Sequence, residues 1–425
     1  MLKPVFTKEE LDQIRSKFYY VEQDYKGEQR IFLDNAGGSL RLKAAEDTFK
    51  RIDKMPDASE HTNKVALELL DIEDKGREDI KEVIFNAKNG VIYPSYTASQ
   101  IMMEVVRVLS ENTEGTNCVT TILEHPSAYD AITYYSKKYN REMRVAQAEK
   151  SIGGVSAESI ISLVDENTAI LCCMAASNIS GYIYDIETVF KKAREINPDI
   201  FIICDAVQHA PHASLDPEKY GIDVMNIAPY KFFGIRGFGV AYISNRVASF
   251  DHHRLLGKEK DDWDIGSPAP AHFASISAIV DYVCWLGAMN SELDSNRRSL
   301  FEAGMKRIAD QERFLLETVL EGTKKMAGLR YIDGIKVQMD SDNLEEKDLI
   351  FSIEFNNMTC EQAVEELDNR GIVTFERSAS SMYSKRMVEA FDKESQGVVR
   401  VSPLHIHTVE EMELFLQTVA EVAKL

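Results

Sequence analysis

An aspartate and a lysine follow two successive apolar runs of the sequence. The apolar residues 202–204 are followed directly by Asp205. Residues 223–227 are followed, after a proline, by Lys231. Short apolar runs that end in a polar residue are typical of buried strands, and open α/β sheets bind ligands at the carboxyl ends of their strands. Glycines follow the lysine and allow a tight backbone around it, at 234, 237 and 239. We therefore expect Asp205 and Lys231 to meet in one site.

This pair of residues suits the cofactor pyridoxal phosphate (PLP). PLP is held through a Schiff base to a lysine amine, and an acid keeps its ring nitrogen protonated. The pair alone leaves simpler interpretations open. An aspartate at the end of a strand often caps a helix, and a lysine near glycines is often a solvated loop residue. The residues around the pair must decide between these interpretations.

The surrounding motifs resemble the class V aminotransferase family of fold-type I PLP enzymes, which includes cysteine desulfurases, selenocysteine lyases and isopenicillin N epimerase. The resemblance covers most of the chain, and two motifs carry it: Asp-Ala-Val-Gln at 205–208, and Tyr-Lys-Phe-Phe-Gly at 230–234 followed by Gly-Phe-Gly. It implies that Lys231 forms the Schiff base and that Asp205 stabilises the pyridinium. It also implies that Gln208 donates to the cofactor's phenolic oxygen. The family's Ser-Xaa-His-Lys is altered here to Ala-Pro-Tyr-Lys at 228–231, where Tyr230 can still offer a hydroxyl.

Residues 94–100 form a strand–turn–helix junction rich in hydroxyl groups. Free N–H groups and the positive end of a helix attract a phosphate, although an ordinary helix cap would have the same sequence. The family resemblance implies that Tyr96 and Thr97 bind the PLP phosphate. Ser95 stands where glycine is common in the family, so the loop geometry is expected to differ.

Two further segments resemble family motifs on the ring side of the site. Glu-His-Pro-Ser at 124–127 matches a motif whose histidine stacks on the pyridine ring and relays protons, so His125 joins Lys231 as a catalytic candidate. A lone histidine would more often be structural. Ser-Asn-Ile-Ser-Gly at 177–181 places Asn178 near the phenolic oxygen.

The carboxyl-terminal half carries two more candidate site residues. Arg400, in the apolar segment 398–402, matches the arginine that clamps the substrate carboxylate, and its planar fork suits that group. Ser267, in Gly-Ser-Pro at 266–268, matches a motif that reaches the phosphate in the neighbouring subunit. The resemblance therefore implies a homodimer with shared active sites, although a simple turn would also explain this segment.

One departure from the family concerns the chemistry. Persulfide-forming desulfurases carry a nucleophilic cysteine on a loop before the arginine, whereas the stretch 374–383 contains no cysteine here. Serine and methionine cannot replace a thiolate as nucleophile. We therefore predict a PLP-dependent C–S (β-elimination) lyase that acts on a small amino acid without a persulfide cysteine. A class V aminotransferase or epimerase and a non-catalytic PLP-fold partner protein remain alternatives.

Alternating strands and helices predict an α/β fold with a mainly parallel seven-stranded sheet in a large domain, plus a small C-terminal α+β domain. The expected division is 1–28 (a segment packing near the small domain), 29–288 (the PLP-binding domain) and 289–425. Thr7 and Glu10 predict a capping box before a helix over 7–16. Further helices are expected over 42–55, 101–109, 186–197, 275–285, 292–328, 360–369 and 409–423, with a polar and helical span at 56–88. Strands are expected over 30–33, 91–93, 118–123, 169–174, 202–204, 223–227, 330–338 and 348–355.

The composition of the 425 residues limits the remaining function classes. A net charge of −20 argues against nucleic acid as a partner. The N-terminus lacks the apolar core of a signal peptide, and no apolar run is expected to reach the roughly 20 residues of a membrane helix. The six cysteines form no CxxC pair, so neither a metal site nor a disulfide framework is expected. These features predict a cytoplasmic protein that does not bind membranes.

Overall fold

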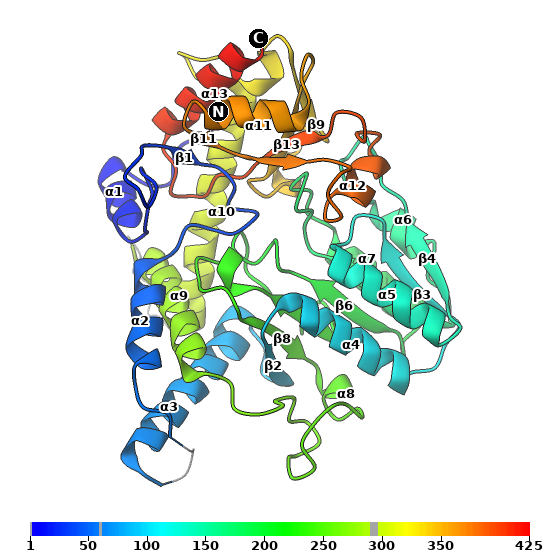
Figure 1. The fold of residues 1–425 in the computed structure, drawn as a ribbon. Coiled ribbons are helices and arrows are strands. Elements are labelled where there is room, and N and C mark those ends of the chain that lie inside the picture. The colour runs from blue at the N-terminus through cyan, green and yellow to red at the C-terminus, as the bar shows by residue number, and fades with distance from the viewer. Residues whose placement is uncertain (1, 59–61, 290–295) are drawn as a thin grey trace.

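The central sheet has seven strands in the order β2-β8-β7-β6-β5-β3-β4 (Figure 1). The computed structural model describes residues 2–58, 62–289 and 296–425. β8 runs antiparallel to both of its neighbours, and the other pairs of adjacent strands are parallel. The predicted mainly parallel seven-stranded sheet is therefore confirmed. The strands are β2 Val91–Ser95, β3 Asn117–Thr121, β4 Glu142–Ala146, β5 Thr168–Met174, β6 Phe201–Asp205, β7 Val224–Ile227 and β8 Gly239–Ile243.

Helices cover both faces of this sheet, which explains why its inner strands are apolar without alternation. Cys172 and Ile203 face one core with α4 (Ala98–Asn112) and α5 (Pro126–Lys138). Their chain neighbours Cys173 and Ile202 face the opposite core. That second core includes residues of α2 (Lys43–Asp53), α6 (Ala157–Ile161), α7 (Ile186–Ile196), α9 (Pro270–Ala288) and α10 (Arg297–Glu321).

Helix α9 corrects one expectation from the sequence. Among the described residues, it is the one helix long and apolar enough to cross a membrane, so an apolar run of that length does exist. Within the fold, 78% of its apolar window is buried. The helix packs against α10, α2 and α3 (Lys64–Glu78), so its apolar residues are used in the core of the protein.

The C-terminal part contains a four-stranded antiparallel sheet in the order β12-β13-β10-β9. Its elements are β9 Ile335–Gln338, β10 Phe351–Phe355, α11 Cys360–Asp368, β11 Ile372–Val373, β12 Phe375–Arg377, α12 Lys385–Ala390, β13 Val398–Val401 and α13 Val409–Val422. The N-terminal chain lies against this part. β1 (Ile31–Phe32) pairs with β11, and Arg15 of α1 (Lys8–Ser16) forms an ion pair with Glu411 at 2.8 Å. The domain boundaries 28/29 and 288/289 stay predictions.

The sequence located most elements to within a few residues. The capping box of Thr7 and Glu10 is present. The span 56–88 contains α3 and a π-helical turn at Asp79–Ile84, whereas its residues 59–61 and the predicted start of the long helix at 292–295 lie outside the described residues. The elements β4, β8, β11, β12, α5, α6 and α12 were not predicted. The short remaining elements are α8 Asn245–Ala248 and 3-10 turns at Pro229–Lys231, Leu329–Tyr331 and Leu344–Glu346.

A buried ionic network connects α10 to one segment that precedes it in the sequence and to one that follows it. Glu312 pairs with His212 at 2.7 Å and accepts from the backbone N–H of His405, whose ring contacts the Tyr282 hydroxyl. Burial alone would lower the pKa of His212, but the Glu312 charge raises it to about 9. Burial would raise the pKa of Glu312, but His212 and His405 lower it to about 2.

Replacing Glu312 by glutamine should therefore destabilise the protein in a pH-dependent way. The His212 contribution is complete below pH 6.5 and is lost as the pH rises through about 9. The Glu312 contribution is complete above pH 4.5 and is lost as the pH falls through about 2. Removing one partner of a buried pair costs about 3–5 kcal/mol, so the loss of unfolding free energy should be largest between pH 4.5 and 6.5.

Chemical unfolding at several pH values measures this effect. The matched control is Glu302→Gln, which removes a half-exposed carboxylate on the same helix and should cost less than about 1 kcal/mol. A Glu312→Gln penalty that stays constant from pH 5 to pH 9.5 would contradict this electrostatic account.

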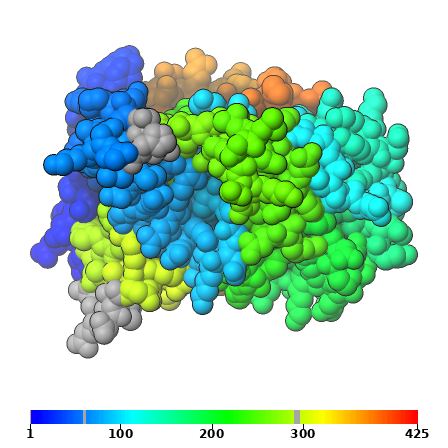
Figure 2. All heavy atoms as spheres, turned by 90° about the horizontal axis from the view of Figure 1, so that it is seen from below, coloured from blue at the N-terminus to red at the C-terminus, as the bar shows by residue number. Residues whose placement is uncertain are grey.

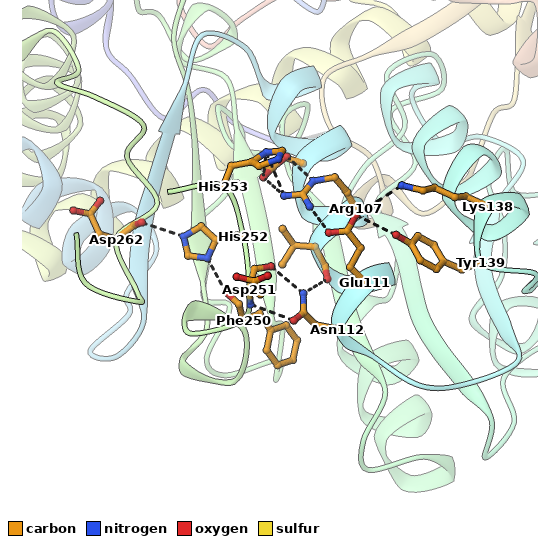
Figure 3. A network of polar contacts seen from close by, with 12 residues as sticks. Arg107, Glu111, Asn112, Lys138, Tyr139, Phe250, Asp251, His252, His253 and Asp262 are labelled. Atoms are coloured by element: carbon orange, nitrogen blue, oxygen red, sulfur yellow. Dashed lines mark hydrogen bonds and ion pairs between the residues drawn. The ribbon is translucent and has the colours of Figure 1, made fainter. Parts of the chain in front are cut away.

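A long loop between α8 and α9 is fastened to α4 by polar contacts (Figure 3). The Asn112 side chain donates to the Asp251 carbonyl and accepts from the Asp251 N–H, at 3.0 and 3.1 Å. The His252 ring contacts the carbonyls of Phe250 and Asp262 and stacks on Trp263. These contacts hold the base of the segment that carries Ser267.

Candidate active site

A cavity of about 640 Å³ opens at the carboxyl edge of the large sheet, against the C-terminal part. The residues that follow strands β5, β6 and β7 line this cavity, and residues of β12 and β13 line its other side. Nine of the ten predicted site residues line this cavity: Tyr96, Thr97, His125, Asn178, Asp205, Gln208, Tyr230, Lys231 and Arg400. The structure therefore brings together residues that the sequence separates by some 300 positions.

Lys231 is a buried amine at the floor of the cavity. It ends the 3-10 turn that follows β7, and its Nζ donates to Oε1 of Gln208 at 3.2 Å. Burial and the nearby Arg400 charge lower the pKa of Lys231 to about 7, and the Asp205 charge opposes the shift. The amine can therefore be neutral near neutral pH, which is the form needed for a nucleophile or a base.

Asp205 ends β6 on the same edge of the sheet and is buried. Burial raises the pKa of its carboxyl, and the N–H of Val207 and the Lys231 charge oppose that shift. The hydrogen bond from Val207 uses Oδ1, and no side-chain hydrogen bond or ion pair of this carboxylate is present among the described residues. A cationic ring nitrogen in the cavity would stabilise its charge.

His125 stands at the N-cap of α5 with its ring held in one orientation. Its Nδ1 accepts from the Ser127 N–H at 3.2 Å and contacts the Ser127 hydroxyl at 2.7 Å. Because Nδ1 accepts, the neutral ring carries its proton on Nε2. Burial and the charges of Lys231 and Arg377 lower the pKa of His125 to about 3. The ring is therefore neutral at physiological pH and suited to stacking.

The N-terminus of α4 reaches the cavity at Tyr96 and Thr97. Thr97 caps the helix, because its hydroxyl accepts from the Gln100 N–H at 3.1 Å. A Cβ at Gly239 would lie 2.5 Å from the Ala98 nitrogen, so glycine lets β8 pack directly under the first turn. The Tyr96 side chain is 78% exposed at the rim. The capping interpretation is thus correct for Thr97, and the helix end still faces the cavity.

Arg400 lies across the cavity from Lys231 and is 2% exposed. Its guanidinium donates to Oδ1 of Asp34 at 2.5 Å and to the Asn178 carbonyl at 3.2 Å. The Nε atom of Arg400 and Oδ1 of Asn178 are buried and have no hydrogen-bond partner among the described residues. These atoms can bind a polar ligand in the cavity.

Ser267 is the predicted site residue that does not reach this cavity. It is exposed and lines a neighbouring hollow of about 820 Å³, which shares Tyr96, Gly237 and Phe238 with the first. The sequence analysis expected Ser267 to act on another subunit. Its place at the rim agrees with that expectation but does not test it.

Several residues of the cavity were missed as site candidates. Among them are Arg236, Phe375, Arg377 and Tyr383. Arg236 covers the ring of Tyr230 at 4.1 Å, and Tyr383 lies near the His125 ring at 6.0 Å. The available signal was the alternation of Phe375 and Arg377, which places both side chains on one face of a strand.

The cysteine thiols of the protein do not line this cavity. All six cysteines are buried, and none of them lines it. Burial raises the pKa of every one of these thiols, which disfavours a reactive thiolate. Within residues 2–58, 62–289 and 296–425, no group of three His, Cys, Asp or Glu side chains could hold a metal ion.

Comparisons with known proteins agree with this arrangement. The chain is 24% identical to a probable cysteine desulfurase of Borreliella burgdorferi over 98% of this chain and 97% of that protein. It is 23% identical to the aminotransferase-like protein FGM3 of Gibberella zeae over 95% and 96%. Among solved structures, the cysteine desulfurase of Thermococcus onnurineus NA1 superposes with a TM-score of 0.80 at 18% identity, over 97% of this chain and 98% of that one. The cysteine desulfurase CsdA of Escherichia coli gives 0.77 at 16%, over 97% and 98%.

The two structural likenesses show the fold, which is that of fold-type I PLP enzymes. The model of the family described as aminotransferase class-V matches residues 31–415, which include all ten predicted site residues. The chain therefore belongs to the aminotransferase class-V family of PLP-dependent enzymes.

Proposed function

We propose that this protein is a PLP-dependent C–S lyase, which eliminates sulfide from cysteine or a thiol from an S-substituted cysteine. The observation that carries the proposal is the cavity itself. It combines a buried amine, a carboxylate, a stacking histidine and an arginine, and it contains no thiol. The relatives named cysteine desulfurases support a sulfur amino acid as substrate. The family alone does not decide what happens to the sulfur.

The residues of the cavity fit PLP. Asp205 offers a buried carboxylate for the ring nitrogen, and Lys231 offers an amine with a single hydrogen bond to Gln208. The unpartnered Oδ1 of Asn178 shows that the cavity wall has polar groups to spare for a ligand. The helix N-terminus at Tyr96 and Thr97 suits the phosphate. A volume of about 640 Å³ lies in the range of cofactor sites.

In the proposed reaction, Arg400 binds the carboxylate of the amino acid and orients its α-carbon. PLP, when bound, withdraws the electrons that are left on that carbon. Lys231 removes the α-proton as general base, for which its lowered pKa suits it. His125 would stack on the pyridine ring of bound PLP, with its own proton on Nε2.

The elimination then balances without any oxidant or reductant. The C–S bond breaks, the electron pair leaves with sulfur, and the sulfur takes a proton to give a thiol or sulfide. Aminoacrylate is left, and water converts it to pyruvate and ammonium. No cysteine of the protein takes part in these steps.

A variant with all six cysteines replaced by alanine should therefore keep its turnover. The expected change in kcat is less than about threefold, because no removed thiol lines the cavity. Loss of buried sulfur atoms should lower stability, so melting temperature is measured alongside pyruvate release. The single variant Cys360→Ala is the control if the full variant folds poorly. A loss of turnover in well-folded Cys360→Ala would contradict the thiol-free mechanism.

We also propose that the active sites are completed in a homodimer, as the family motif around Ser267 implies. The segment from α8 to α9 lies on the surface and forms the centre of the face in Figure 2. It exposes the apolar side chains of Leu256 and Ile265. Ile265 lines the hollow beside the cavity together with the exposed Tyr96. An exposed apolar patch of this kind is typical of a contact surface.

Light scattering should show a dimer, and Leu256→Asp should weaken it by placing a charge in the contact. In a dimer that shares its sites, Ser267→Ala should weaken binding of added PLP by roughly tenfold, as expected for one lost hydrogen bond to a charged group. A fully active monomer at micromolar concentration would refute this proposal.

A further inference from the structure

Arg377 is a buried cation in the wall of the cavity that forms no ion pair with any described residue, although the charges of Asp34 and Glu376 act on it from farther away. It ends β12 and is 5% exposed. Its Nε and Nη2 atoms have no hydrogen-bond partner in the part of the chain that the structure describes, and no carboxylate lies within ion-pair distance. A buried charge without a partner is costly, so a ligand is the natural partner.

The neighbouring Arg400 is in a different state. Asp34 neutralises it at 2.5 Å, whereas Arg377 has no such acid. The two arginines belong to paired strands, β12 and β13, and both project into the same cavity. Their guanidinium carbons lie 5.8 and 5.2 Å from the centre of one Phe375 ring, which Arg377 and Arg400 both cover. One small molecule can therefore touch both arginines.

The charges in the cavity are consistent with an anion at Arg377. Burial and Arg400 lower the pKa of Arg377 to about 9, so the guanidinium still carries its proton at neutral pH. The positive charge of Arg377 also contributes to the lowered pKa values of His125 and Lys231. A negative group bound at Arg377 would relieve repulsion among these cations.

We propose that the substrate carries a second anionic group on its side chain and that Arg377 binds this group while Arg400 binds the α-carboxylate. This inference rests on the proposed C–S lyase function and names its substrate class: cysteines whose sulfur substituent ends in a carboxylate or a similar anion. A neutral side chain would leave Arg377 buried without a partner.

A pair of substrates that differ in one charge tests the proposal. S-carboxymethyl-L-cysteine carries the second anion, and S-carbamoylmethyl-L-cysteine is its neutral isostere. The wild-type enzyme should favour the acid by about 100-fold in kcat/KM, the range of a charged hydrogen bond. Arg377→Gln should lower that preference by about 100-fold, and Arg377→Lys should restore part of it.

Arg400→Gln is the matched control, because it should weaken both substrates and leave their ratio within about threefold of the wild type. A structural role for Arg377 would lower both activities in the same way without changing the ratio. No preference in the wild type, or an unchanged ratio in Arg377→Gln, would overturn the proposal. Equal losses for both substrates in Arg377→Gln would mean that Arg377 acts on packing or on the α-carboxylate that both substrates share, and either reading would overturn the proposal.

Binding without turnover separates this inference from the proposed function. Adipate has both carboxylates at a similar spacing and no reacting amine, and adipic acid monoamide is its singly charged control. Calorimetry on the cofactor-loaded protein should show tighter binding of adipate, lost in Arg377→Gln. If neither cysteine derivative releases thiol but adipate binding still depends on Arg377, the lyase function fails and the dianion site stands.

Discussion

Replacing Lys231 by alanine should remove turnover almost completely. The change deletes the amine that attaches the cofactor and the base that moves the α-proton. Loss of a positioned base alone costs about 100-fold to 10,000-fold in rate, and loss of covalent attachment adds to it. The fold should survive, because the strands β7 and β8 hold this turn and the side chain makes one hydrogen bond.

Two measurements check this prediction besides activity. Borohydride should fix PLP to the peptide that contains Lys231 in the wild type and should fix none in the variant. Lys347 provides the matched control, because it is another buried lysine, with its pKa lowered by burial to about 8, and it lies outside the cavity. Lys347→Met should retain the fixed cofactor. Cofactor attached at Lys347 instead of Lys231 would refute the assignment.

Arg400→Gln should have the second largest effect, mainly on substrate capture. The guanidinium is buried, so losing its bond to a carboxylate should cost about 2–5 kcal/mol, or roughly 30-fold to several thousand-fold in KM. In the absence of substrate, Asp34 occupies the same guanidinium at 2.5 Å. Substrate binding must therefore compete with Asp34.

This competition supplies the matched control for Arg400. Asp34→Asn removes the competing charge and keeps the arginine, so its KM should be no higher than that of the wild type. A fall of kcat in Arg400→Gln with an unchanged KM would show that the arginine does not bind the substrate.

The sequence predicted the fold well because the signals were local. Apolar runs such as 169–174 are buried on both faces of the sheet and mark its strands, and Thr7 with Glu10 marks a helix start. Most of the candidate site residues belong to motifs at the ends of predicted strands. Because neighbouring strands end at the same edge of the sheet, nine of these residues lie in one cavity. The roles of these residues stay predictions.

The missed features depend on contacts between distant parts of the chain. Asp34 neutralises Arg400 across 366 positions, and nothing in either segment indicates that pairing. The lone charge of Arg377 became visible from the absence of partners around a buried atom, which a sequence does not encode locally. β4 is a half-exposed edge strand with charged residues, so its apolar pattern was weak.

A full balance of products from purified enzyme and L-cysteine tests the central claim most directly. Pyruvate, ammonium and sulfide should appear in equal amounts, alanine should be absent, and mass spectra should show no added sulfur on any cysteine. An aminotransferase would instead require a keto acid as amino acceptor, and an epimerase would yield the D-amino acid. Alanine in place of pyruvate, together with a persulfide on one of the six cysteines, would contradict a lyase that works without a protein thiol.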